Sequence, residues 1–186
     1  MSKILKVCTL AGALLINSTF AQAEETLTGW LLDFGRTKEV KPVTNAQYQQ
    51  ECGDCHIAYQ PGLLPSKSWA KLLTSEALKD HFGDNAELDQ ATLKPIYDYA
   101  MEYAADKSYY KRSRKIALAT ETGEAPLRIV EVRYIKRKHK DIPEEMVKGN
   151  KDVKSLSQCN KCHTQAEKGI YDEDTVSIPN YPDWDD

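Results

Sequence analysis

Two short stretches of the sequence repeat one pattern of cysteine and histidine. Both read C-x-x-C-H, first as Cys52, Gly53, Asp54, Cys55, His56 and later as Cys159, Asn160, Lys161, Cys162, His163. Two thiols at this spacing can each add to a vinyl group of one porphyrin, and the adjoining histidine then lies beneath the iron. The sequence therefore predicts two covalently bound haem c groups. The attachment points are Cys52, Cys55, Cys159 and Cys162, and the proximal iron ligands are His56 and His163.

A C-x-x-C pair can also form a redox disulfide or part of a zinc site. The N-terminal segment helps to distinguish these alternatives from haem attachment. Residues 1–23 combine two lysines, an apolar run over 7–16 and the sequence Ala-Gln-Ala before residue 24. This pattern is typical of a cleavable secretory signal, and the run is too short to span a bilayer. Cleavage near Ala23 removes Cys8, so no cysteine outside the haem motifs remains for a structural disulfide. We expect a periplasmic protein with no membrane span in the mature chain.

The number of histidines matches the number of axial positions on two irons. The sequence contains four histidines, and two of them belong to the motifs. His81 follows His56 by 25 residues and His139 precedes His163 by 24, so each spare histidine is local to one motif. Histidine also has many other roles in proteins. We favour bis-histidine ligation, with the iron ligands His56, His81, His139 and His163.

Methionine is the competing axial ligand, because its thioether raises the haem potential relative to histidine. Met101 falls within an apolar helical stripe, where methionine is more often part of the core. Met146 is the stronger rival at the second haem, and lysine ligation also stays open.

The composition and the hydrophobic pattern predict a mainly α protein. We expect a small two-lobed dihaem c-type cytochrome, with helices and long loops wrapped around two covalent haems. Only 41% of residues are hydrophobic and 28% are charged, so the haems should supply part of the core. The predicted parts are a signal peptide (1–23), an N-terminal haem lobe (24–106), a linker or exposed loop (107–126) and a C-terminal haem lobe with an acidic tail (127–186).

Caps and apolar periodicity locate the helices. Ser66 and Asp89 are predicted N-caps, and Gly169 is a predicted C-cap. Residues 127–135 are the only stretch with strand character. The predicted helices run from residue 44 into the first motif, over 66–83 with His81 near the end, over 90–105, over 134–140 with His139, and through the second motif to Gly169.

The residues that flank the motifs resemble those of the small dihaem cytochromes c, the DHC family. The matching residues are 51–66, Ser68, Trp69, 81–86, Leu88 and Asp89 in the first region, and 159–164, 169–172, Ile178 and Pro179 in the second. This resemblance implies bis-histidine haems and electron donation to a small oxygen-binding monohaem cytochrome c. It also implies a membrane cytochrome b as the donor in some settings.

Three functional classes follow from the coordination. Two nitrogen ligands leave no open position, which favours electron transfer over catalysis. A small dihaem peroxidase would need a labile position, and a ligand-binding or redox-sensing module would need a distal histidine that dissociates.

The charge is unevenly distributed along the chain. The formal charge is -3, and removal of the two signal lysines makes it -5. Basic runs lie in 107–115 and 133–140, and an acidic tail occupies 172–186. Such fields can steer a redox partner. The overall sign and the lack of a binding motif argue against nucleic acid as a partner.

Overall fold

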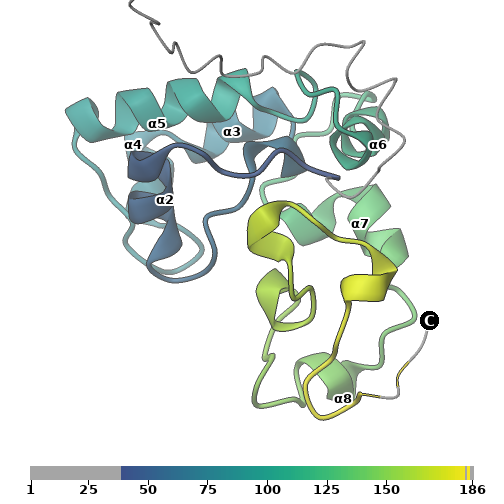
Figure 1. Cartoon of the computed structure of the whole chain (residues 1–186). Coiled ribbons are helices and arrows are strands. Elements are labelled where there is room, and N and C mark those ends of the chain that lie inside the picture. Colours follow the sequence, from purple (N-terminus) through teal and green to yellow (C-terminus); the bar gives the residue numbers. More distant parts are fainter. Residues whose placement is uncertain (1–38, 183, 185–186) are drawn as a thin grey trace, which may run out of the picture.

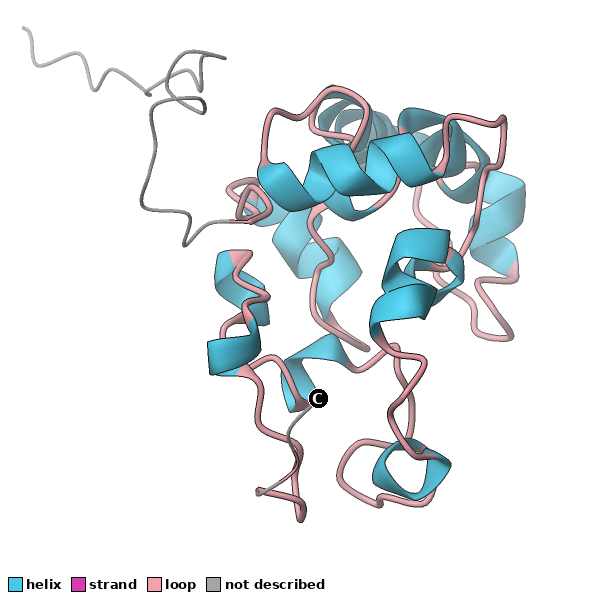
Figure 2. Cartoon of the chain, turned by 90° about the vertical axis from the view of Figure 1, so that its right-hand side faces the viewer, coloured by secondary structure: helices cyan, strands magenta, loops and turns pink. Residues whose placement is uncertain are grey.

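Short helices joined by long loops make up the part of the chain that the computed structural model describes, residues 39–182 and 184. Within these residues no β-strand forms, and the extended backbone is limited to isolated bridges such as His163 with Val176. Figure 2 shows the loops between the helices. The mainly α prediction is confirmed. The predicted signal peptide (1–23) and the end of the acidic tail lie outside the described residues.

The helices lie in two groups. Figure 1 shows α2 to α5 together at one end of the molecule and α7, α8 and the C-terminal segment at the other. The α-helices are α2 (Ala46–Gly53), α3 (Ser66–Leu72), α4 (Ser75–Lys79), α5 (Gln90–Glu102), α6 (Lys111–Ala119), α7 (Arg133–Lys138) and α8 (Glu144–Val147). The 3-10 turns are η1 (Pro61–Leu63), η2 (Ile129–Glu131), η3 (Cys159–Lys161), η4 (Ala166–Lys168) and η5 (Glu173–Thr175).

Side-chain caps explain where several of these helices begin. The Asp89 carboxylate accepts hydrogen bonds from the amides of Ala91 and Thr92, so α5 starts where its cap predicts. The Asn45 side chain accepts from the amide of Tyr48 and opens α2, which carries the first haem motif at its end.

The helix predicted over 66–83 is interrupted, which corrects the sequence-based expectation. Its first part, α3, ends at Leu72, because Leu73 leaves helical geometry. The Thr74 hydroxyl then accepts from the amide of Ala77 and caps the second part, α4. Ser66 is the first residue of α3 and not its cap, since Pro65 occupies the cap position.

Residues 107–126 contain the helix α6, although the sequence suggests a loop there. Ile116 and Ser113 of α6 are completely buried, so a basic helix with a narrow apolar stripe packs against the core. Residues 127–135 form η2 and the start of α7, and the suspected strand is absent from them. The second motif begins in the turn η3, and a separate turn, η4, follows the motif in place of one continuous helix. Gly169 ends η4 in a left-handed conformation with a φ of 74°.

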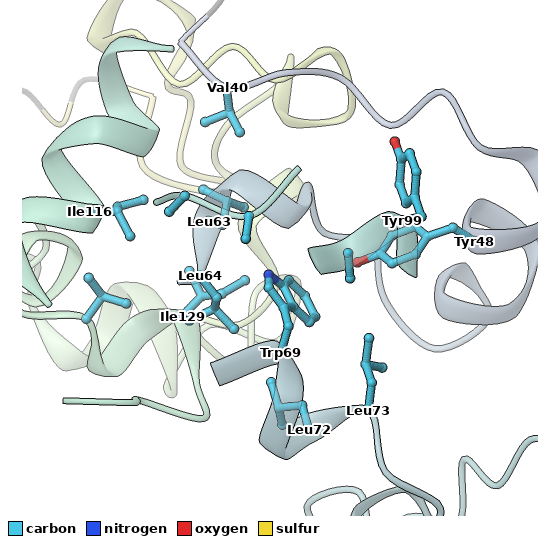
Figure 3. Close-up of a cluster of buried hydrophobic side chains, with 14 of the residues drawn as sticks. Val40, Tyr48, Leu63, Leu64, Trp69, Leu72, Leu73, Tyr99, Ile116 and Ile129 are labelled. Atoms are coloured by element: carbon cyan, nitrogen blue, oxygen red, sulfur yellow. The ribbon is translucent and has the colours of Figure 1, made fainter. Parts of the chain in front are cut away.

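The hydrophobic core lies between α3, α5, α6 and η1. Figure 3 shows Trp69 at its centre, close to Leu64 and Leu72. The Trp69 indole N–H donates to the Pro61 carbonyl at 2.8 Å, which joins α3 to η1. This core therefore holds the segment that follows the first motif in a fixed position.

Candidate haem-binding sites

The first motif lies at the end of α2. Cys52 is in the last turn of the helix, and Cys55 is exposed just beyond it. The Nδ1 of His56 lies 2.7 Å from the Ile57 carbonyl oxygen, so Nδ1 must carry the proton that is donated. This hydrogen bond leaves Nε2 of His56 available as a metal ligand, the usual arrangement for ligating histidines.

The second motif lies in η3 and the residue pair that follows. The amide of His163 donates to the Cys159 carbonyl at 2.8 Å, which folds the motif into a tight turn. The His163 ring is edge-on to Tyr171 with centroids 5.2 Å apart. Burial lowers the pKa of His163 to about 4, with smaller contributions from His139 and Arg112. The imidazole is therefore neutral near pH 7, which is the form that ligates iron.

No disulfide joins the four motif cysteines, so all four sulfur atoms can attach to haem. Burial raises the pKa of Cys52 to about 12 and that of Cys159 to about 11. Among residues 39–182 and 184, no cluster of three or more histidine, cysteine or acidic side chains is arranged to hold a bare metal ion.

His81 lies in a tight turn after α4, near the first motif. Its amide donates to the Asp84 carbonyl at 2.8 Å, and Phe82 takes a left-handed conformation with a φ of 59°. Burial lowers the pKa of His81, and the charge of His56 is the next largest cause. The buried Nδ1 of His81 has no hydrogen-bond partner among the described residues.

His139 lies at the C-terminal end of α7, beside the second motif. Its Nδ1 donates to the Ile135 carbonyl at 2.8 Å, which leaves Nε2 free. The rings of His139 and His163 have centroids 5.9 Å apart and are inclined by 73°. The structure thus brings together the histidines of the second predicted pair, His139 and His163. The pairing of His81 with His56 stays a prediction, as does the ligation of iron by these histidines.

These residues fit the haem groups that the motifs imply. Each motif offers two cysteines and an imidazole, and the second site adds the imidazole of His139, whose Nδ1 donates to the Ile135 carbonyl and leaves Nε2 free for iron. Met101 packs against the hydrophobic core, the role expected for it. A bound haem supplies reversible one-electron chemistry at its iron.

Three residues that the sequence interpretation did not single out connect the two sites. The Tyr59 ring stacks on His56 with centroids 4.5 Å apart, and its hydroxyl donates to the Ser157 carbonyl. Tyr171, which contacts His163, donates to Gln60 Oε1 at 2.7 Å. The nearest signal in the sequence is that Tyr59 and Tyr171 follow the motif histidines by three and eight residues.

A buried ion pair adjoins the second site and was also not predicted. Arg112 of α6 donates to the Glu39 carboxylate, and the Glu39 side chain is only 5% exposed. The same guanidinium donates to the Tyr171 carbonyl and to the Tyr134 hydroxyl, each at 3.0 Å. It therefore holds α6 and α7 against the segment that contacts His163.

The two motifs, the pairing of His139 with His163 and the helical fold together define a dihaem c-type cytochrome. The family described as dihaem cytochrome c, DHC, matches residues 48–171. By this match and by the structural relatives below, the chain belongs to the dihaem cytochrome c family and carries two covalently bound haem c groups.

Solved structures of two relatives are similar to the chain. A dihaem cytochrome c from Shewanella baltica OS155 is 41% identical, with a TM-score of 0.62, over 76% of this chain and 98% of the relative. A dihaem cytochrome c from Rhodobacter sphaeroides is 36% identical, with a TM-score of 0.62, over 71% of this chain and all of the relative. No curated protein matches the chain.

Proposed function

We propose that this dihaem cytochrome is a periplasmic electron carrier. It passes single electrons between a membrane or soluble donor and a small oxygen-binding monohaem cytochrome c. The observation that carries the proposal is the pairing of His139 with His163, whose ring centroids are 5.9 Å apart. Two imidazoles at one iron leave no position for a substrate, and such an iron changes little between its two oxidation states.

The Nδ1 hydrogen bonds support the same role. His56 and His139 each donate to a backbone carbonyl, so one histidine of each predicted pair has a fixed ring orientation. Ligands that are held rigidly keep the reorganisation on electron transfer small. These bonds also tune the potential, because a hydrogen-bonded imidazole is a more basic ligand.

Export is part of the proposal. The motif pattern requires attachment of haem to thiols, and the pattern of residues 1–23 is that of a secretory signal. Of the helices that the structure describes, none has the length and apolar character needed to cross a membrane.

A ligand-binding or redox-sensing module is the second candidate, and one observation at the first haem favours it. The ring of His81 has no Nδ1 partner in the described chain, and the next residue, Phe82, has a φ of 59°. A bulky residue in this conformation is strained. In this second candidate His81 is the ligand that dissociates, because its turn is strained and its ring is not held through Nδ1.

A low-temperature electron paramagnetic resonance spectrum of the oxidised holoprotein tests the proposal. Two low-spin bis-histidine signals and no binding of carbon monoxide to the reduced protein are expected. Replacement of His139 by alanine should create one carbon monoxide site, and His81→Ala should create one at the other haem. A substantial high-spin fraction in the wild type, or stoichiometric carbon monoxide binding, would show that the coordination is open and that the protein is not a closed carrier.

A further inference from the structure

Cations from two helices gather around one aromatic ring beside the second haem site. The charged ends of Arg112, Lys115 and Arg137 each lie 5.8 Å from the centroid of the Tyr134 ring. After burial, the charges of Lys111 and Arg112 are the main causes that lower the pKa of Lys115. Helices α6 and α7 therefore share one positively charged region, and Figure 1 shows them on the same side of the molecule.

This region adjoins both histidines of the second pair. Arg112 donates to the carbonyl of Tyr171, whose ring contacts His163. Ile135 of α7 accepts the Nδ1 hydrogen bond of His139 at 2.8 Å. A partner that docks on α6 and α7 would thus be close to the second haem.

Some of these basic side chains form ion pairs with carboxylates of the protein itself, and others do not. Glu39 pairs with Lys111 and Arg112, and Glu173 pairs with Lys138. Lys115, Lys136 and Arg137 are exposed and form no ion pair with any carboxylate of the described residues. This unbalanced charge is available to an external anion.

The loop that carries His81 is richer in acidic residues, although Arg128 also lies over the ring of its neighbour Phe82. In the loop from the end of α4 to the start of α5, the exposed acidic residues are Asp80, Asp84, Glu87 and Asp89. The basic residue of this stretch, Lys79, pairs with Glu87. The formal charge of the whole chain is -3, so the local positive charge at α6 and α7, and not the net charge, would attract an acidic protein.

We propose that this exposed basic face, formed by Lys115, Lys136 and Arg137, is the docking surface for a redox protein that presents carboxylates around its own cofactor. A partner bound there would be placed to exchange one electron with the haem that the second motif holds, one cofactor being oxidised as the other is reduced. The inference rests on the proposed carrier function and adds the site and the chemistry of one partner.

The test uses the oxidised holoprotein and two reductants. The first is a reduced plant-type ferredoxin, an acidic one-electron donor, and the second is the methyl viologen radical cation, a small positive donor. The face variant is Lys136→Glu with Arg137→Glu. Its matched control is Lys71→Glu with Lys94→Glu, which makes the same change of charge at exposed positions of α3 and α5. Reduction is followed by stopped flow in the haem absorbance bands.

The ferredoxin rate constant should fall about tenfold or more in the face variant at low salt, and by much less in the control. This difference should vanish near 1 M salt, where the Debye length is about 3 Å. The viologen rate should not fall in either variant. Lys136→Gln with Arg137→Gln should give an intermediate ferredoxin rate, and unchanged haem spectra would show that the variants fold.

Equal loss of the ferredoxin rate in both glutamate variants would overturn the docking surface. It would also be overturned if the face variant kept its ferredoxin rate but lost co-sedimentation with phosphatidylglycerol vesicles, since the face would then bind a membrane. Failure of the carrier function is distinguishable: neither reductant would then reduce the wild-type haems to low-spin ferrous iron.

Discussion

The Tyr171 hydroxyl donates a 2.7 Å hydrogen bond to the side-chain oxygen of Gln60 and so joins the segment after the second haem motif to the segment after the first. Gln60 is completely buried and donates in turn to the Ala166 carbonyl at 2.6 Å. Burial raises the pKa of Tyr171 well above its ordinary value, so the phenol stays protonated and remains a donor. These contacts fix the segment after the second motif relative to the segment after the first.

Replacement of Tyr171 by phenylalanine should destabilise the holoprotein by about 1–3 kcal/mol, because it leaves the buried oxygen of Gln60 without its donor. The measurement is the guanidinium midpoint, followed by far-UV circular dichroism. Tyr109→Phe, at a residue that is 42% exposed, removes the same atom type and should leave the midpoint unchanged. Equal midpoints for the two variants would contradict the role of the Tyr171 hydrogen bond.

Gly169 should not tolerate a side chain. It has a φ of 74°, and an added Cβ would lie 2.1 Å from the Val40 carbonyl oxygen. The matched control is Gly123→Ala, since Gly123 has a φ of 95° and nothing within 4 Å of an added Cβ. In Gly123→Ala, the left-handed backbone alone should lower the free energy of unfolding by about 1–2 kcal/mol. Gly169→Ala should lower the stability further, because the clash with the Val40 carbonyl adds to the backbone cost. Thermal unfolding and the yield of haem-loaded protein measure this. A smaller loss of stability than in the control would refute the clash.

Replacement of Arg112 should strongly destabilise the protein. Arg112→Met leaves the buried Glu39 carboxylate without its main partner, and breaking such a pair costs about 3–5 kcal/mol. The double variant Arg112→Met with Glu39→Gln should recover part of this loss, because no buried charge is then left. In the exposed pair of Lys138 and Glu173, Lys138→Met should have only a small effect on the unfolding midpoint.

Asp106, whose carboxylate accepts hydrogen bonds at the start of α3, should make the stability of the protein depend on pH in the acid range. Burial raises the pKa of this carboxyl, but hydrogen bonds from the Ser66 hydroxyl and amide, both at 2.6 Å, outweigh it and lower the pKa overall. A carboxylate with a lowered pKa stabilises the fold above its unfolded pKa, and this contribution is lost as the pH falls through the folded value.

Thermal unfolding of the wild type and of Asp106→Asn between pH 7 and pH 3 measures this contribution. The wild type should be more stable at pH 7, and the difference should shrink below about pH 4. A difference that stays constant over this range would exclude the carboxylate as its source. Asp98→Asn, at an exposed carboxylate of α5, serves as the control.

The sequence by itself determined the chemistry of this protein. C-x-x-C-H is a local pattern, so both attachment sites and both proximal histidines can be recognised without the fold. The Asp89 cap of α5 and the Gly169 cap of η4 were also predictable, because capping depends on neighbouring backbone groups. The spacing of His139 to the second motif also agrees with the contact between the rings of His139 and His163.

Only the tertiary structure decided how the two sites are joined. Long-range packing makes a helix of residues 111–119, where a run of basic residues suggests a loop, because Ile116 and Ser113 are buried against distant parts of the chain. The bond from Tyr171 to Gln60 joins residues 111 positions apart, and the pair of Arg112 and Glu39 joins residues 73 apart. No local pattern encodes such contacts, since each depends on the fold that brings both partners to one place.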